Sequence, residues 1–413
     1  MDVAALDAGV RLTTLRSGAR VATDPMAHTM SVSIACFVGV GSRDEAEHLA
    51  GASHFLEHLL FKGTTRRTAR EINRAVDAVG GDFNAYTVRE STVFYVRVPA
   101  AFADFAVELI CEIIANPRID SDDVEIERNV ILGELDGALD SPDDVVFMNL
   151  AEAMFAGHPL GRETLGDPDT LERMTPSQIA GFHHDWYRPA NLVFAAAGAV
   201  DHDRVVEIIG RHFDDVAAGS RPDRVTPGAD IEPVVADVRP IEQVHLALGW
   251  RGVAATDPDR VPLAVLNHAL GDGPSSRLHE EIRERRGLAY TVSSMAASNL
   301  DVGAQTVYCA TAPEHVAEVR SVIDSTIASI IADGVDDDEL TVAKGYLSGS
   351  MLMALEDSSS RMSRLGSAVL THGRAMTIRE SLDAVDAVTH DDVRAVARAV
   401  FDGEPVVSTV GPD

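Results

Sequence analysis

Apolar residues recur along this chain with two different spacings, and the two spacings alternate. Continuous apolar and β-branched runs predict buried strands at 32–40, 94–98 and 192–197. Apolar residues three and four positions apart predict amphipathic helices at 51–61, 69–79, 101–115 and 122–139. This order of elements predicts an α+β fold, in which helices pack on a mostly antiparallel sheet.

The second half of the chain repeats the order at a spacing of about 212 residues. The repeat predicts further strands and helices at 244–248, 260–270, 316–332, 336–355 and 406–411. Self-similarity of this kind indicates two homologous α/β domains that arose by duplication. A Gly- and Pro-containing stretch between the halves has the composition of a linker. We therefore expect an N-terminal domain over 1–217, a linker over 218–238 and a C-terminal domain over 239–413.

Length, charge and cysteine usage narrow the class of protein. A chain of 413 residues is too long for one hydrophobic core, and its formal net charge of −30 argues against binding to nucleic-acid phosphates. No run approaches the roughly 20 apolar residues of a membrane-spanning helix, and the N-terminus lacks a basic, apolar leader. Cys36, Cys111 and Cys309 stand alone in apolar runs, which predicts buried free thiols. We expect a cytoplasmic protein without a membrane span.

One segment of the first half combines side chains that can bind a metal ion. In His54-Phe55-Leu56-Glu57-His58, the two histidines lie one helical turn apart and share a helix face. Glu57 falls on the adjoining part of that face, where its carboxylate can reach a water molecule at the metal. A catalytic zinc site of this kind needs a third protein ligand and one open position.

The long helix expected at 122–139 offers candidates for the third ligand. It carries Glu125, Glu127 and Glu134, and the last two lie two helical turns apart and face the same way. One of these two carboxylates can bind the metal while the other orients a ligand. No cysteine is nearby, which argues against a closed structural zinc site. The equivalent positions of the second half are occupied by Leu266, Ala269, Leu270 and Tyr346, so we expect the metal only in the first half.

Four segments resemble the family of pitrilysin, insulinase and the mitochondrial processing peptidases, zinc metallopeptidases also called inverzincins. The segments read GVGSRDE from Gly39, GASHFLEHLLFKGT from Gly51, GGDFNAYT from Gly80 and ERNVILGE from Glu127. Family members carry the order H-x-x-E-H. The resemblance covers nearly the whole chain. It implies one Zn²⁺ per chain, held by His54, His58 and Glu134, which lies 76 residues after His58.

The resemblance also implies roles for residues outside the ligand set. Glu57 would be the catalytic base, and Glu127 would support the ligands. In the second half, Arg283 and Tyr290 have the seven-residue spacing of a pair that reaches the active site in family members. Without the resemblance, they read as a helix-surface cation and a half-buried strand aromatic. The remaining implied residues would contact substrate: Asn84 and Ala85 at a strand edge, and Gly271 and Gly273 in a glycine-containing loop.

Taken with the motif, the resemblance implies a zinc-dependent endopeptidase that hydrolyses extended peptides or unfolded segments inside a chamber. Family chambers consist of four such domains, so a chain with two domains implies a homodimer. Two alternatives remain open. The chain could be a non-catalytic or partner-dependent subunit of a processing-peptidase-like heterodimer, or a metal-binding module without peptidase activity.

Overall fold

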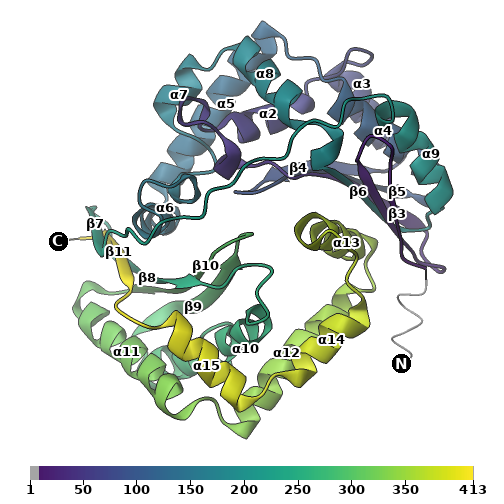
Figure 1. Cartoon of the computed structure of the whole chain (residues 1–413). Coiled ribbons are helices and arrows are strands. Elements are labelled where there is room, and N and C mark those ends of the chain that lie inside the picture. The colour runs from purple at the N-terminus through teal and green to yellow at the C-terminus, as the bar shows by residue number, and fades with distance from the viewer. Residues whose placement is uncertain (1–8, 413) are drawn as a thin grey trace. The chain divides into compact units, whose positions relative to one another are not determined.

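The computed structural model describes residues 9–412 and contains two β-sheets with helices packed on them (Figure 1). By their contacts, the described residues form two compact units. Unit 1 contains the segments up to 135, 163–224 and 352–380, and unit 2 contains 136–162, 225–351 and the segment from 381 onward. The predicted α+β class is confirmed. Each unit draws segments from both halves of the sequence.

Sheet 1 belongs to unit 1 and has six strands. Its spatial order is β1 (Arg11–Thr14), β2 (Arg20–Pro25), β6 (Leu192–Gly198), β3 (Ser31–Val38), β5 (Thr92–Pro99) and β4 (Asp82–Thr87). All neighbours are antiparallel except β2 and β6, which are parallel. Strand β4 forms one edge of this sheet.

Sheet 2 belongs to unit 2 and repeats this arrangement without a counterpart of β1. Its order is β7 (Val234–Val238), β11 (Val406–Gly411), β8 (Val244–Gly252), β10 (Gly303–Thr311) and β9 (Ala289–Ser298). Again one neighbouring pair, β7 and β11, is parallel, and the other neighbours are antiparallel. Strand β7 occupies the last five residues of the stretch expected to be a linker, because its backbone pairs with β11.

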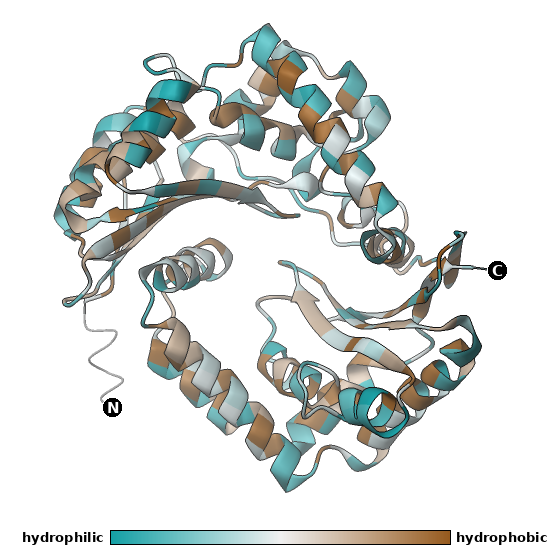
Figure 2. Cartoon of the chain, turned by 180° about the vertical axis from the view of Figure 1, so that it is seen from behind, coloured by the Kyte–Doolittle hydropathy of each residue, from teal (hydrophilic) through white to brown (hydrophobic). Residues whose placement is uncertain are grey.

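The helices follow the predicted segments closely where a prediction was made. In chain order they are α2 (Ala52–Leu60), α3 (Ala69–Ala78), α4 (Ala103–Ala115), α5 (Ser121–Asp140), α6 (Pro142–Met154), α7 (Pro168–Arg173), α8 (Pro176–Trp186), α9 (His202–Phe213), α10 (Arg260–Leu270), the π-helix η6 (His279–Arg285), α11 (Val316–Asp333), α12 (Asp337–Ala354), α13 (Ser358–His372), α14 (Ile378–Ala387) and α15 (His390–Val400). Figure 2 shows most of them banded in brown and teal, as amphipathic helices should be.

Both faces of sheet 1 are covered, which explains why β3 is apolar at nearly every position. Ile34 and Cys36 face the core shared with α2 and α4, whereas Ala35 and Phe37 face Met362 and Leu365 of α13. A strand buried on both faces reads as a continuous apolar run because alternation is needed only where one face meets water.

Two helices pack on a sheet whose strands come mainly from the other half of the sequence. Helix α13, from the second half, packs on sheet 1, and α6, from the first half, packs on sheet 2 (Figure 1). In each of the two contacts, a glycine on one element faces a large side chain on the other. Gly366 of α13 leaves room for the ring of Phe37, and Gly249 of β8 leaves room for Met154 of α6, so that a Cβ on either glycine would overlap its neighbour.

Candidate active site

Helix α2 places two histidines side by side in unit 1. His54 and His58 lie one turn apart, and their ring centroids are 4.7 Å apart in an edge-on arrangement. Phe55, Leu56 and Leu59 on the other faces of α2 are fully buried and fix the helix in the core. The apolar residues of the motif therefore determine the direction in which the imidazoles point.

A carboxylate from α5 completes a group of three possible ligands. Oε2 of Glu134 lies 3.7 Å from Nε2 of His54 and 3.5 Å from Nε2 of His58. Ligand atoms in a tetrahedral zinc site with bonds of about 2.1 Å are about 3.4 Å apart. The donor set and these separations therefore fit Zn²⁺. Within residues 9–412, no other group of three His, Cys, Asp or Glu side chains has the spacing to hold a metal ion.

Burial keeps the first histidine in the form that can bind a metal. Desolvation, followed by the neighbouring His58, lowers the pKa of His54 to about 4. The ring is therefore neutral near pH 7 and has a lone pair free for coordination. Nδ1 of His54 is buried and makes no hydrogen bond, whereas metal-binding histidines usually donate this second proton to a partner.

The second histidine is oriented by a chain of two further side chains. Nδ1 of His58 lies 2.8 Å from Oε2 of Glu127, and the other carboxylate oxygen of Glu127 forms an ion pair with Nζ of Lys62. Glu127 is almost completely buried, at 4% exposure. The structure thus brings both glutamates of the predicted pair to the histidines, with Glu134 toward the Nε2 atoms and Glu127 behind His58. Sequence reasoning did not identify Lys62.

Glu57 lies on the same helix and is held by a residue from the edge of sheet 1. Oγ1 of Thr87, the last residue of β4, donates a hydrogen bond of 2.5 Å to Oε2 of Glu57. Desolvation raises the pKa of Glu57 above its usual value, and the Thr87 hydrogen bond acts in the opposite direction. The raised pKa suits a carboxylate that accepts and returns a proton. Thr87 is the last residue of the GGDFNAYT segment that carries the family resemblance, but its bond to Glu57 was not foreseen.

Strand β4 offers a free edge beside these residues. Phe83, Ala85 and Thr87 face the core side of the sheet, whereas Asn84 and Tyr86 are exposed on the other side. Oδ1 of Asn84 accepts a hydrogen bond from the backbone N–H of Ala85. The two residues predicted to contact substrate are therefore adjacent on an edge strand to which, within residues 9–412, only β5 pairs, and their side chains lie on opposite faces.

The structure brings Arg283 and Tyr290 together within unit 2. The guanidinium of Arg283 lies 4.4 Å from the centroid of the Tyr290 ring, in a cation–π contact. Arg283 belongs to the π-helix η6, an element that is frequent at functional sites. Gly287 has a positive φ between the helix and β9, as expected from its predicted role in ending the helix. Tyr290 is 77% exposed and not half-buried.

The glycines of the predicted substrate loop have packing reasons of their own. A Cβ on Gly271 would lie 2.8 Å from the backbone N of Ser294, and one on Gly273 would lie 3.1 Å from the ring of His268. The same histidine stacks on Tyr346, with ring centroids 4.2 Å apart. Tyr346 stands where the first half has Glu134. At the same offset His268 corresponds to Leu56, so one member of this stack stands at a position equivalent to a ligand.

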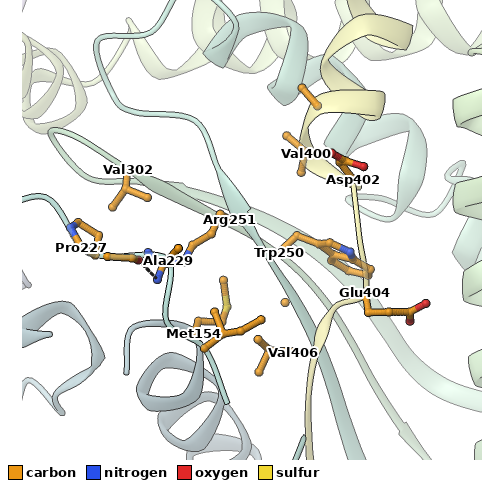
Figure 3. Close-up of a pocket in the computed structure, with 14 residues that line it drawn as sticks. Met154, Pro227, Ala229, Trp250, Arg251, Val302, Val400, Asp402, Glu404 and Val406 are labelled. Carbon is orange, nitrogen blue, oxygen red and sulfur yellow. Dashed lines mark hydrogen bonds between the residues drawn. The ribbon is translucent and has the colours of Figure 1, made fainter. Parts of the chain in front are cut away.

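Unit 2 also contains an open cavity of about 450 Å³ (Figure 3). It lies at the end of β8, beside Trp250 and Arg251, and Asp402 and Glu404 contribute carboxylates to its lining. The guanidinium of Arg251 donates a hydrogen bond to the carbonyl oxygen of Gly228 at 3.2 Å. None of the predicted site residues lines this cavity. Among the described helices, none has the length and apolar character needed to cross a membrane.

Comparison with known proteins identifies relatives along the whole chain. Residues 20–168 match the family described as insulinase (peptidase family M16), and residues 173–347 match the peptidase M16 inactive domain. The chain is 41% identical to an uncharacterized zinc protease of Mycobacterium leprae, over 99% of this chain and 93% of that protein. It is 32% identical to an uncharacterized zinc protease of Bacillus subtilis, over 97% of both proteins.

Solved structures share the fold over nearly their full length. A protease from Helicobacter pylori superposes with a TM-score of 0.89 at 24% identity, covering 97% of this chain and 98% of the other. A peptidase M16 inactive domain from Pseudomonas fluorescens superposes with a TM-score of 0.92 at 20% identity, covering 98% of each chain. The resemblance inferred from the four sequence segments is confirmed, and the chain belongs to peptidase family M16, the insulinase family.

Proposed function

We propose that this chain is a zinc-dependent endopeptidase that hydrolyses extended peptides or unfolded segments of proteins. The observation that carries the proposal is the meeting of His54, His58 and Glu134 around one point, with Glu57 on the same helix. The names of the relatives support zinc and protease chemistry. A single Zn²⁺ per chain fits the three ligands.

Each group of the proposed site has a separate role in peptide hydrolysis. A bound Zn²⁺ supplies Lewis acidity, which polarises a carbonyl group and lowers the pKa of water. Glu57 accepts the proton of the attacking water and returns it to the leaving amine. Glu127 orients His58 through Nδ1. The family resemblance assigns Arg283 and Tyr290 to the oxyanion, where one well-placed donor contributes about 3 to 4 kcal/mol.

The free edge of β4 supports an extended substrate. A peptide can add to such an edge as a further strand, so that main-chain hydrogen bonds give affinity and side-chain pockets give selectivity. We place this contact along Asn84 and Ala85, and assign a further contact to Gly271 and Gly273. The strongly acidic charge favours peptides with Arg or Lys near the scissile bond. Equal cleavage rates for neutral and basic peptides of one series would contradict this preference.

The family resemblance further implies a homodimer that encloses its substrate. Because the first half carries the ligands and the second half carries the Arg283 and Tyr290 pair, two copies of one chain could be sufficient. Sedimentation of the purified protein would distinguish one chain from two. A chamber also predicts that the protein cleaves unfolded polypeptides and spares the same proteins when they are folded.

The first test of the function is hydrolysis of a quenched mixed-sequence peptide library by the wild type and by Glu57→Gln. We expect metal-dependent turnover by the wild type and a loss of at least about a hundredfold in the variant, because the general base is removed. Bound zinc, measured by atomic emission, should remain near one per chain in both proteins because Glu57 is not a ligand.

The remaining outcomes separate the alternatives. Zinc without turnover in the wild type would favour a partner-dependent or non-catalytic subunit, and proteins that co-purify with the chain would then be tested for restored activity. Wild-type protein that binds no zinc, or turnover that survives both chelation and Glu57→Gln, would contradict the proposed function.

A further inference from the structure

Lys62 is one of only two lysines in the chain. The other is Lys344, and all other cations among Lys and Arg are arginines. Lys344 lies in unit 2, where Nζ donates a hydrogen bond to the backbone carbonyl of Asp386. Lys62 follows α2 by two positions and pairs with Glu127, which is bonded to His58.

The surroundings of Lys62 contain more negative than positive charge. Glu57, Glu127 and Glu134 all lie around the two histidines. Within residues 9–412, Lys62 is the one Lys or Arg that forms an ion pair with any of these three carboxylates. Glu127 is the most deeply buried of them, and a buried carboxylate without a compensating charge is costly.

We propose that Lys62 is a positioning residue, which acts through Glu127 to fix His58 for metal binding. The ammonium group occupies one oxygen of Glu127, so that the other oxygen accepts the Nδ1 proton of His58. With the proton on Nδ1, the lone pair is on Nε2, the atom that faces Glu134. This inference rests on the proposed zinc site and adds a residue behind it.

The point-like ammonium group suits this position. An ammonium group makes a compact contact with one oxygen, whereas a guanidinium favours bidentate contact with both oxygens of a carboxylate. At Glu127 the second oxygen is already used by His58. A lysine at position 62 therefore contacts one oxygen of Glu127 and leaves the other oxygen available to Nδ1 of His58.

The test measures metal affinity directly, without activity. Zn²⁺ binding would be followed by competition with a chromophoric chelator for the wild type, Lys62→Met, Glu127→Gln and the double variant. Loss of an outer partner of a metal ligand typically weakens metal binding 10- to 100-fold. We expect a dissociation constant raised about tenfold or more in Lys62→Met. Because Lys62 acts through Glu127, the double variant should bind no more weakly than Glu127→Gln alone.

A spectroscopic readout and a matched control complete the design. The visible absorption of the Co²⁺-substituted protein reports the ligand geometry and should change in the same way in Lys62→Met and Glu127→Gln. Lys344→Met should match the wild type in affinity and spectrum. Circular dichroism of each metal-free variant verifies that it is folded. If Lys62→Met does not fold, the milder Lys62→Gln takes its place.

The outcomes are distinguishable from failure of the proposed function. If the wild type binds no Zn²⁺, the zinc site itself is wrong. If the wild type binds Zn²⁺ while Lys62→Met binds it equally well or more tightly, only the role of Lys62 is overturned. Effects of Lys62→Met and Glu127→Gln that multiply in the double variant would overturn it as well, because Lys62 would then act by a route other than Glu127.

Discussion

The bond between Thr87 and Glu57 connects the proposed base to the edge on which substrate would bind. Thr87 ends β4, and its hydroxyl holds one oxygen of the carboxylate. A strand that adds to β4 would therefore form next to a residue that orients Glu57. This arrangement requires no movement of α2, since both partners are already in contact.

Thr87→Val should impair catalysis while leaving zinc binding intact. A hydrogen bond to a charged group contributes about 1.5 to 3 kcal/mol, so kcat/KM should fall about tenfold or more. The hydroxyl lowers the pKa of Glu57, so its removal should move the acidic limb of the pH profile to higher pH. Thr87→Ser keeps the hydroxyl and should restore most of the rate. An unchanged profile in Thr87→Val would show that the bond has no catalytic role.

His183 should make unit 1 sensitive to acid. Burial lowers the pKa of His183 to about 4, and Nε2 bonds to the carbonyl of Ile114 at the end of α4. Between pH 6.5 and 4 the unfolded chain binds the proton that the folded chain refuses, so stability falls as pH decreases through this window. The loss is at most about 3 kcal/mol.

The measurement is urea unfolding of the metal-free protein at pH 7 and at pH 5. His183→Gln should show a smaller loss of stability between the two pH values than the wild type. The neighbouring His184 is exposed, so His184→Gln should behave like the wild type. An equal pH dependence in all three proteins would contradict the prediction.

At the scale of residues, spacing along one helix was predictable and contacts between elements were not. The positions of His54, Glu57 and His58 follow from the helical period alone. The choice of Glu134 over Glu127 as the ligand candidate required the family resemblance, because both face the same way on α5. The contacts of Lys62 and Thr87 join residues 65 and 30 positions apart, and no local pattern reports such pairs.

At the scale of elements, α2 depends on a cap from outside the helix. Its first residues follow Gly51, which has a φ of +95° and no side chain to accept a hydrogen bond. The buried Glu45 replaces such a cap: its two oxygens accept hydrogen bonds from the backbone N–H groups of Gly51 and Ser53 at 2.7 and 2.6 Å. A carboxylate at this end also complements the helix dipole.

Glu45→Ala should therefore destabilise unit 1 and loosen the histidines. It leaves two buried N–H groups without an acceptor, at a cost of about 1 to 3 kcal/mol for each group. We expect the midpoint of thermal unfolding to decrease and zinc affinity to weaken. The exposed Glu47 in the same segment provides the control, since Glu47→Ala should change neither quantity. A thermal midpoint equal to that of the wild type would show that water can replace the cap.

Most elements with a strong period were visible in the sequence, whereas the edge strands β1 and β7 and the exchanged helices α6 and α13 were not. The boundaries of α2, α3, α10 and β11 agree with the predicted ranges to within one residue. Strand β7 was assigned to a linker because its edge position leaves Val234 and Val238 exposed and gives no buried run. The amphipathic character of α6 and α13 does not specify which sheet each covers, because either sheet offers an apolar face.

At the scale of the whole molecule, the excess of acidic side chains should make stability depend on salt. A formal charge of −30 produces self-repulsion in the folded chain. Raising NaCl from about 0.02 M to about 1 M shortens the screening length to roughly 3 Å and should raise the midpoint of thermal unfolding. The zinc-loaded protein is the appropriate sample. A midpoint that falls with NaCl would show that surface ion pairs outweigh the repulsion.

The reciprocal placement of α6 and α13 makes each half of the sequence unable to bury its own sheet. A chain that ended near residue 217 would leave Phe37 without α13, and its α6 would have no sheet to cover. The N-terminal and C-terminal halves of the chain bury these faces by exchanging α6 and α13 with each other, as subunits exchange elements in domain-swapped dimers. A protease nick between 225 and 233 would therefore leave two fragments that hold each other by exchanged helices, and the intact chain is a covalently joined form of that pair.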